Sequence, residues 1–187
     1  MKLIQLKYLA IPVILLLAGC ISVPVPDPTP EKNTLLAGKI LVDVNTTGRA
    51  RGVNDSYDFG IRVFFQNNDT GRETAISTHT DGWLITNALP AGNYTITQLT
   101  FTSTVSRTKW TFTLHGPYHV TIAEGMVNNI GSIEIEVGNE RYSWRFISHD
   151  SVRNEFGTLF PDSEWNAYEW RNDNAFVRTA QQPDKNP

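Results

Sequence analysis

Apolar and polar residues alternate with a period of two in several short stretches between Leu35 and Val137. This alternation is typical of strands with one face buried and the other in water. We expect the inward-facing residues to be Ile40, Val42, Val44, Ile61, Val63, Phe65, Trp110, Phe112, Leu114, Val120, Ile122, Ile133, Ile135 and Val137. Turn-forming pairs such as Asp81-Gly82 and Glu124-Gly125 separate the stretches. About eight short strands without a helical period predict a mainly β fold, an antiparallel β-sandwich over residues 35–147.

The pattern changes after residue 141. One last strand is predicted there, with its alternate positions occupied by Tyr142, Trp144 and Phe146. A helix follows with Ser148 or Asp150 as the N-cap, because short polar side chains accept hydrogen bonds from the first free backbone N–H groups. The apolar face of this helix consists of Val152, Phe156 and Leu159. The segment Pro161-Asp162-Ser163 ends it and begins a second short helix, so we expect residues 148–187 to form a helical tail with a frayed C-terminus.

Aromatic residues are concentrated in this last part of the chain. Nine of the 20 aromatic residues lie between Tyr142 and Phe176. They either pack the tail onto one sheet or stay exposed as a platform for sugar rings or a protein partner, since exposed aromatic side chains mark binding surfaces. The candidate binding residues are Trp144, Trp165, Tyr168 and Trp170. The sequence leaves both alternatives open.

The N-terminus has the three-part layout of a secretory signal peptide. Lys2 and Lys7 supply positive charge, residues 9–17 are apolar, and two small residues precede Cys20, the one cysteine of the chain. The apolar stretch is shorter than the about 20 residues that a transmembrane helix needs. We therefore expect residues 1–19 to be removed as a signal peptide.

The segment Leu17-Ala18-Gly19-Cys20 resembles the bacterial lipobox. The resemblance implies a lipoprotein signal peptide and a mature chain whose first residue, Cys20, carries a diacylglyceryl thioether and an amide-linked acyl chain such as palmitate. Each buried methylene contributes about 0.8 kcal/mol, so two or more chains give a stable membrane anchor. Acylation also removes a thiol that could pair between molecules in an oxidising compartment. The alternative is an ordinary signal peptide with a cysteine near its cleavage site.

Residues 20–34 combine this cysteine with a proline-rich spacer. Proline occupies every second position from Pro24 to Pro30. Proline at this density favours the extended polyproline II conformation, which rises about 3.1 Å per residue. Such a spacer would hold a domain roughly 40 Å from the membrane surface.

Charge argues against one class of partner. The full chain has a net charge of −3, and the expected loss of Lys2 and Lys7 makes the mature chain more acidic. Nucleic-acid-binding proteins carry clustered basic residues, and the sequence has no such cluster. We expect no nucleic-acid partner.

Two turn motifs in the middle of the chain carry a second resemblance. Asp81-Gly82-Trp83-Leu84 is followed by Leu89-Pro90-Ala91-Gly92-Asn93-Tyr94. The pattern resembles the carboxypeptidase-regulatory-like and collagen-adhesin B-type domains, in which an Asp-Gly turn opens one strand and a Leu-Pro-x-Gly-x-Tyr turn leads into the next. The resemblance covers about residues 36–137 and implies a transthyretin-like, Ig-like sandwich. It implies little about function, because this fold serves as adhesin stalk, glycan-binding module and inert spacer.

The same resemblance bears on an internal isopeptide bond. In some adhesin B-type domains a first-strand lysine joins a last-strand asparagine, and a buried glutamate beyond the motif tyrosine transfers the proton. Lys39 and Asn128 or Asn129 match the bonding pair. Gln98 stands at the glutamate position, and because an amide cannot shuttle a proton, we expect no isopeptide bond.

Signals for metal binding or catalysis are weak. His115 and His119 are separated by a Gly-Pro pair, which forbids a helix that holds both on one face. One oxygen-rich loop consists of Asn54, Asp55 and Asp58, without the ordered spacing of a calcium loop. The sequence contains no nucleophile-elbow, phosphate-loop or zinc-protease motif. We expect no metal, no cofactor and no enzymatic activity.

These observations together predict a lipid-anchored protein of the cell envelope whose sandwich is a non-catalytic binding or structural module. The alternative is a carbohydrate-binding module of a surface glycan system. The expected partners are the membrane, through the N-terminal lipid, and a protein or a glycan. Ile21 stands where Gram-negative sorting patterns place Asp in proteins kept at the inner membrane, which by resemblance favours the outer membrane.

Overall fold

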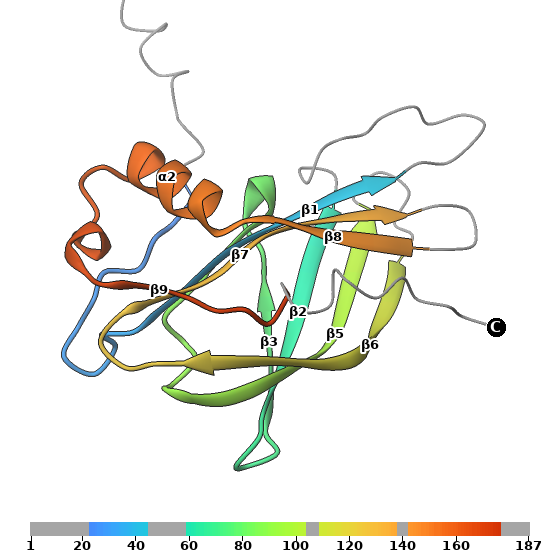
Figure 1. Ribbon diagram of the computed structural model, residues 1–187, viewed down its shortest axis with the longest axis horizontal. Coiled ribbons are helices and arrows are strands. Elements are labelled where there is room, and N and C mark those ends of the chain that lie inside the picture. The colour runs from blue at the N-terminus through green and yellow to red at the C-terminus, as the bar shows by residue number, and fades with distance from the viewer. Residues whose placement is uncertain (1–22, 45–58, 104–108, 138–141, 177–187) are drawn as a thin grey trace, which may run out of the picture.

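The computed structural model describes residues 23–44, 59–103, 109–137 and 142–176. Most of these residues form strands, together with one α-helix and two short 3-10 helices (Figure 1). In chain order the elements are β1 (Leu35–Val44), β2 (Phe59–Asn67), β3 (Glu73–Ser77), η2 (Thr80–Gly82), β4 (Trp83–Thr86), β5 (Gly92–Ser103), β6 (Lys109–Ile122), β7 (Val127–Val137), β8 (Tyr142–Ser148), α2 (His149–Leu159), η3 (Glu164–Ala167) and β9 (Trp170–Asn172). The predicted mainly β fold is confirmed.

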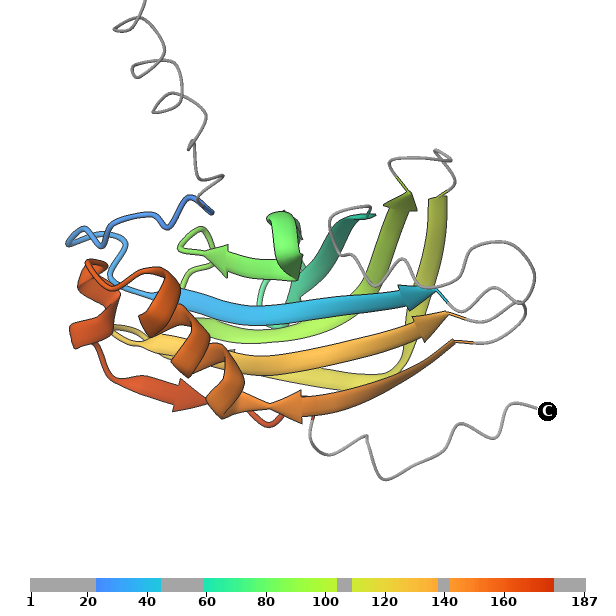
Figure 2. The ribbon, with the colours of Figure 1, turned by 90° about the horizontal axis from the view of Figure 1, so that it is seen from above.

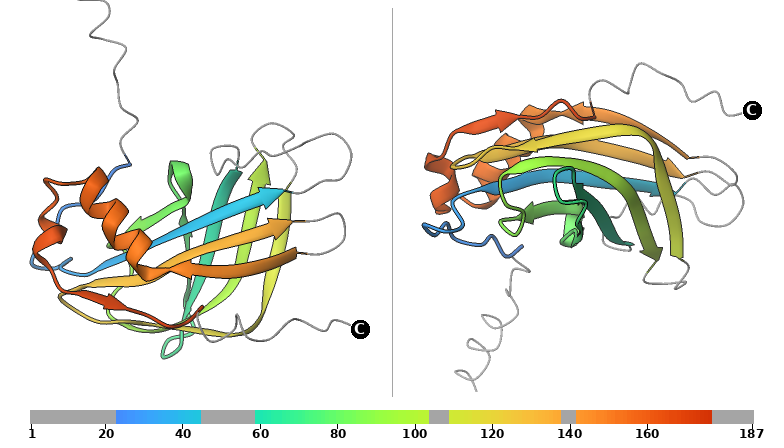
Figure 3. Two further views of the ribbon diagram at one scale, coloured as in Figure 1. Left: turned by 45° about the horizontal axis from the view of Figure 1, so that its top comes forward. Right: turned by 90° about the horizontal axis from the view of Figure 1, so that it is seen from below.

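The strands form two sheets with a shared apolar interior. The five-stranded sheet has the order β4-β1-β7-β8, with β9 paired to β7 as well. The four-stranded sheet has the order β3-β2-β5-β6. Figures 2 and 3 show β1, β7 and β8 running side by side in one layer, with the long strands β5 and β6 curving through the other. This arrangement is consistent with the predicted β-sandwich.

The direction of pairing differs from the prediction in one sheet. The four-stranded sheet is antiparallel throughout, but β1 pairs with β7 in parallel, and so does β9. The expectation of a purely antiparallel sandwich is therefore wrong for the five-stranded sheet. Parallel neighbours need a long crossover connection, and here the whole four-stranded sheet lies between β1 and β7 in the chain. Alternation of side chains is the same in either direction, so it could not reveal this.

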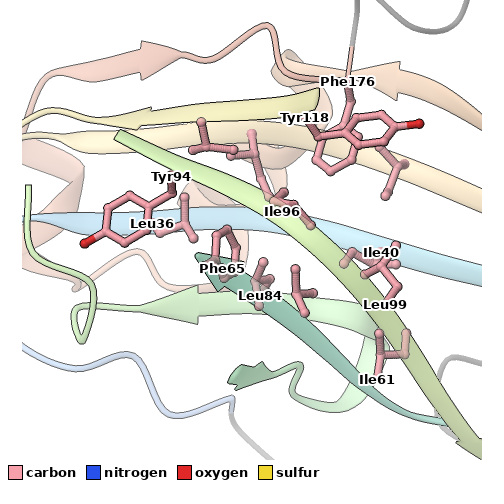
Figure 4. Packing of buried hydrophobic residues seen from close by; sticks show 14 of the residues in the cluster. Leu36, Ile40, Ile61, Phe65, Leu84, Tyr94, Ile96, Leu99, Tyr118 and Phe176 are labelled. Carbon is pink, nitrogen blue, oxygen red and sulfur yellow. The ribbon is translucent and has the colours of Figure 1, made fainter. Parts of the chain in front are cut away.

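An inner cluster of buried apolar side chains lies between the two sheets (Figure 4). It takes side chains from one face of β1, β2, β4, β5, β6 and β7, as the alternation predicted, and partly buried side chains of β3 and β8 pack against it. The predicted core residues whose side chains are described are buried: Ile40, Val42, Ile61, Val63, Phe65, Val120, Ile122, Ile133 and Ile135. The side chains of Val44, Trp110, Phe112, Leu114 and Val137 lie outside the described part of the structure.

A β-bulge at Gly131 reverses the facing of β7 along its length. Residues 37–39 of β1 are matched by residues 129–132 of β7, so β7 carries one extra residue there. Gly131 adopts a positive φ of 81°, which glycine tolerates without steric cost. Before the bulge Val127 joins the apolar cluster outside the sheet, whereas Ile133 beyond it joins the inner cluster. The bulge therefore lets one strand supply two different apolar layers.

The second apolar layer covers the outer face of the five-stranded sheet. Figures 1 and 2 show α2 lying across one end of this face. We call the buried residues of this layer the outer cluster; they are Leu35, Ala37, Trp83, Ile85, Val127, Val152, Phe156 and Trp165. Near this end, β1 and β4 are therefore buried on both faces.

Helix α2 begins at one of the two predicted caps. The Ser148 hydroxyl accepts hydrogen bonds from the backbone N–H of Asp150 at 3.0 Å and of Ser151 at 3.4 Å. These bonds satisfy two of the orphan donors of the first turn. Ser148 is thus the N-cap, and Asp150 lies within the helix.

The apolar face of α2 is shorter than predicted. Val152 and Phe156 are completely buried in the outer cluster, but Leu159 is 54% exposed, so its predicted place on the buried face is wrong. Phe160 follows Phe156 by one helical turn and packs against the outer cluster instead. Leu159 is the last residue of the helix, and its side chain lies largely in solvent.

The two turn motifs of the sequence bracket β4 and β5. Asp81 and Gly82 both have positive φ, 66° and 74°, and β4 starts at the next residue. A Cβ on Gly82 would lie 2.0 Å from the Ile40 carbonyl oxygen, so only glycine fits. In the second motif the Tyr94 hydroxyl donates a hydrogen bond of 2.9 Å to the Pro90 carbonyl, which fixes the turn into β5. Both motifs act as predicted.

Candidate functional site

The N-terminal segment (residues 23–34) and the tail (residues 149–176) meet over the outer cluster. Trp165 lies at their junction, in η3, and its side chain is completely buried. Its indole Nε1 donates a hydrogen bond of 2.6 Å to the Pro26 carbonyl oxygen, across 139 positions of the chain. We call the N-terminal segment and residues 149–170 the outer layer, because together they cover one end of the outer face of the five-stranded sheet.

The N-terminal segment is folded onto the domain. Val23 and Val25 are partly buried against the outer cluster. Thr29 and Lys32 form a small turn through two backbone hydrogen bonds of 3.2 and 3.0 Å. The buried Thr34 hydroxyl accepts a hydrogen bond from a backbone N–H in the turn before β7. The stretch predicted to be a free spacer therefore lies against the sandwich from Val23 onward, and its expected reach of roughly 40 Å is not available while it stays there.

Aromatic rings hold the tail onto the sheet. The Phe156 ring centroid lies 5.0 Å from that of Phe160, 5.2 Å from Trp170 and 6.3 Å from Trp83. These distances and the steep interplanar angles are those of edge-to-face packing. Trp83 Nε1 is buried and has no hydrogen-bond partner among the described residues. The rings near Phe156 thus serve packing first.

The four candidate binding residues are divided between two places. Trp165, Tyr168 and Trp170 belong to the outer layer, where Trp165 has no exposed surface and the other two are partly exposed. Trp144 lies on β8 and packs against the inner cluster, with its ring 5.6 Å from Tyr118. The structure therefore does not bring the four residues together as one exposed platform, and Trp165 cannot contribute to any platform in this conformation.

The end of the tail closes one side of the sandwich. After β9, the Asp173 carboxylate is buried and accepts hydrogen bonds from the backbone N–H of Thr121 at 3.1 Å and of Ala175 at 2.8 Å. Arg171 donates to the Thr121 carbonyl at 2.6 Å. Phe176 then enters the inner cluster beside Tyr118 (Figure 4). The tail thus connects β7 of one sheet with β6 of the other, a role that the sequence analysis missed.

The two asparagines considered for an isopeptide bond stabilise backbone turns. Asn128 is buried, and its side chain both accepts from the Ala123 N–H at 2.8 Å and donates to the Ala123 carbonyl at 2.9 Å. The buried Asn129 amide donates to the carbonyl of His149 at 3.0 Å and to the Asn172 side chain at 3.1 Å. The side-chain amide of each asparagine therefore already has hydrogen-bond partners in its own surroundings.

Lys39 points to the outer layer, where its partner lies on α2. Its ammonium group forms an ion pair of 2.5 Å with Glu155 on α2 and lies 5.5 Å from the Trp83 ring centroid. Gln98 lies on β5, in the four-stranded sheet, whereas Lys39 lies on β1 of the other sheet. Gln98 therefore lies in the other sheet from Lys39 and from both asparagines.

The remaining candidate residues are mostly outside the described ranges. Cys20, Asn54, Asp55 and Asp58 lie there, and so does the side chain of His115. The His119 ring is exposed and forms a hydrogen bond of 3.1 Å with the Thr95 hydroxyl. Among the described residues, no group of three or more His, Cys, Asp and Glu side chains could hold a metal ion. Within the same ranges, no helix has both the length and the apolar character needed to cross a membrane.

Comparison with known proteins identifies no family for this chain, because no protein-family model and no curated protein matches it. The solved structures that are weakly similar to it include two of different kinds. A leucine-rich repeat protein from Bacteroides thetaiotaomicron has 16% identity and a TM-score of 0.35, with 56% of this chain and 14% of that chain covered. (S)-Allantoin synthase has 13% identity and a TM-score of 0.27, with 67% of this chain and 46% of that chain covered. The chain thus spans less than half of either structure, and TM-scores this low carry no argument.

Proposed function

We propose that the protein is lipid-anchored in the bacterial cell envelope through Cys20 and that its sandwich is a non-catalytic structural or binding module. The observation that carries this proposal is the position of the lipobox-like segment relative to the folded part. Cleavage before Cys20 leaves a mature chain that is packed onto the domain from Val23, three residues later. The cleavage position that the lipobox resemblance implies thus lies within three residues of a side chain that packs on the domain.

The buried polar side chains support a non-catalytic module. Four buried side chains are each hydrogen-bonded to backbone groups of a turn, a neighbouring strand or the start of α2: Asn128, Asn129, Thr34 and Asp173. Catalytic groups must instead reach a substrate from a cleft. Buried polar side chains that form hydrogen bonds to the backbone stabilise the fold, and this use is typical of a scaffold.

We propose further that the sandwich is of the transthyretin-like, Ig-like type. Two local features support this: the Asp81-Gly82 turn that opens β4, and the hydrogen bond from Tyr94 to Pro90 at the entry to β5. The outer membrane is the proposed location in a Gram-negative cell, since Ile21 follows the lipidated cysteine.

The test of the anchor replaces the acylated sulfur. Cys20→Ser should abolish partition into the detergent phase, and the intact mass of wild type should exceed that of residues 20–187 by the mass of the diacylglyceryl group and the amide-linked acyl chain. Ser22→Ala is the matched control, because it changes a neighbouring residue and leaves the thiol in place. A Cys20→Ser protein that is still cleaved and acylated and still partitions into the detergent phase would contradict the proposal.

A further inference from the structure

The tether between the proposed lipid site and the folded domain is short. Only Ile21 and Ser22 lie between Cys20 and Val23. An extended chain spans at most about 3.3–3.6 Å per residue, so the Cα atoms of Cys20 and Val23 are at most about 11 Å apart. Acyl chains place the cysteine at the boundary between hydrocarbon and headgroups, and that headgroup zone is itself several ångströms deep. Val23 must therefore lie close to the lipid headgroups.

Several independent contacts keep the N-terminal segment in place. Val23 and Val25 pack against the outer cluster, and the Pro26 carbonyl accepts the hydrogen bond from the buried Trp165. Further along, the Thr34 hydroxyl accepts from the turn before β7. Release of the segment would expose apolar surface and leave the Trp165 indole N–H without its acceptor, which costs free energy. The docked segment is thus the stable state, and the tether stays short.

The surface around Val23 suits the edge of a bilayer. Phe160, Tyr168 and Trp170 are partly exposed at the rim of the outer cluster, and the neighbouring Leu159 is 54% exposed. Tyr and Trp are enriched at membrane–water interfaces, where the ring meets the apolar region and the polar atom meets water. The exposed charged side chains of the outer layer are mostly acidic: Asp27, Glu31, Asp150, Asp162, Glu164 and Glu169 against Lys32 and Arg153. Anionic lipid headgroups would repel this negative charge, so the outer layer is better suited to a surface of zwitterionic lipids.

We infer that the short tether holds the outer layer against a zwitterionic lipid surface, an inference that rests on the proposed anchor at Cys20. The sandwich then has a fixed orientation: the outer layer faces the lipid, and the β2–β3 turn faces away. Figure 1 and the left view of Figure 3 both place that turn on the opposite side of the domain from α2. The partner of the outer layer is the membrane that carries the anchor.

Energy transfer from single labels tests the orientation. Cys20 is the one cysteine of the chain and its thiol is consumed by acylation, so a new cysteine gives a unique label. Asn154→Cys places the donor on the exposed side of α2, and Asp69→Cys places it in the β2–β3 turn, where Asp69 is exposed as well. The full lipidated protein is reconstituted in phosphatidylcholine vesicles with a headgroup-labelled acceptor lipid. Transfer should be stronger from position 154 than from position 69.

A third variant isolates the tether. Insertion of about 20 Gly and Ser residues between Ser22 and Val23 adds a reach of about 25 Å. Energy transfer from position 154 should then no longer exceed that from position 69. If it still does, the short tether is not the cause of the orientation. Equal transfer from the two positions in the protein of native length would overturn the orientation. Vesicle flotation separates the two proposals: protein that fails to float contradicts the anchor, whereas floating protein with equal transfer contradicts only the orientation.

Discussion

Replacement of Phe156 by alanine probes how the tail is held to the sandwich. Phe156 is completely buried, and its ring lies within edge-to-face distance of Trp83, Phe160 and Trp170. Truncation removes the ring but leaves α2 intact, because alanine has the highest helix propensity. The change therefore reports on packing between the helix and the five-stranded sheet.

The expected loss follows from the burial of this side chain. Phe→Ala substitutions at fully buried positions cost about 3–5 kcal/mol, which includes the lost transfer free energy and the cavity that remains. The surrounding residues Trp83 and Trp170 are fixed on strands of the sheet, so the cavity can collapse only in part. For a domain of this size, about 2–4 °C per kcal/mol corresponds to a melting temperature lower by about 6–20 °C.

Urea unfolding followed by far-UV circular dichroism measures this loss. Tryptophan fluorescence is less suitable, because two indoles contact the substituted ring. Leu159→Ala on the same helix is the matched control, since its side chain is 54% exposed and should change stability by no more than about 0.5 kcal/mol. Equal unfolding midpoints for Phe156→Ala and Leu159→Ala would refute the packing argument and reopen the tail as a binding surface.

Two further substitutions test the turn into β4 and the end of the tail. Gly82→Ala should cost at least about 4 kcal/mol or prevent folding, because its Cβ would lie 2.0 Å from the Ile40 carbonyl oxygen, whereas Gly71→Ala, with a similar φ and open space, should cost about 1–2 kcal/mol. Similar urea midpoints for the two glycine variants would contradict this. Asp173→Ala should cost about 1–3 kcal/mol and expose the tail to proteolysis, since two partly buried backbone N–H groups lose their acceptor, which is itself buried. The exposed Asp162→Ala is its control, and an unchanged rate of tail cleavage in Asp173→Ala would show that the carboxylate does not hold the tail.

Local rules predicted those parts of the fold that depend on neighbouring residues. The period of two identified the inner face of the strands, because the pleat alone decides on which face of the sheet each side chain lies. Ser148 was one of the two predicted caps, because its hydroxyl bonds to N–H groups only two and three residues away. The turn at Gly82 was predicted because glycine at a single position is enough to allow a positive φ.

Features that depend on distant partners were missed. Strand β9 is three residues long and forms because β8 pairs only with residues 132–137, which leaves the start of β7 free for a second partner. The parallel direction of β1 and β7 has no signature in either strand. The docked position of residues 23–34 depends on a proline carbonyl and on Trp165, far away in the chain.

One signal of the outer layer was nevertheless present in the sequence. Leu35-Leu36-Ala37 and Trp83-Leu84-Ile85 are apolar without alternation, and such runs are typical of strands that are buried on both faces. In the structure both runs lie between the inner cluster and the outer cluster. The unbroken runs therefore indicated that something must cover the outer face at this end, although they could not identify the N-terminal segment as part of the cover.

The two ends of the chain depend on each other through that cover. Trp165 belongs to the tail and Pro26 to the N-terminal segment, and one hydrogen bond and one apolar cluster join them. Loss of the tail would remove both the donor and much of the apolar surface on which Val23 and Val25 rest, so the N-terminal segment would be released. The proposed tether would then gain the length of residues 23–34, and the domain could leave the lipid surface. The aromatic residues gathered near the C-terminus would thus set how close to the membrane the proposed anchor at Cys20 holds the sandwich.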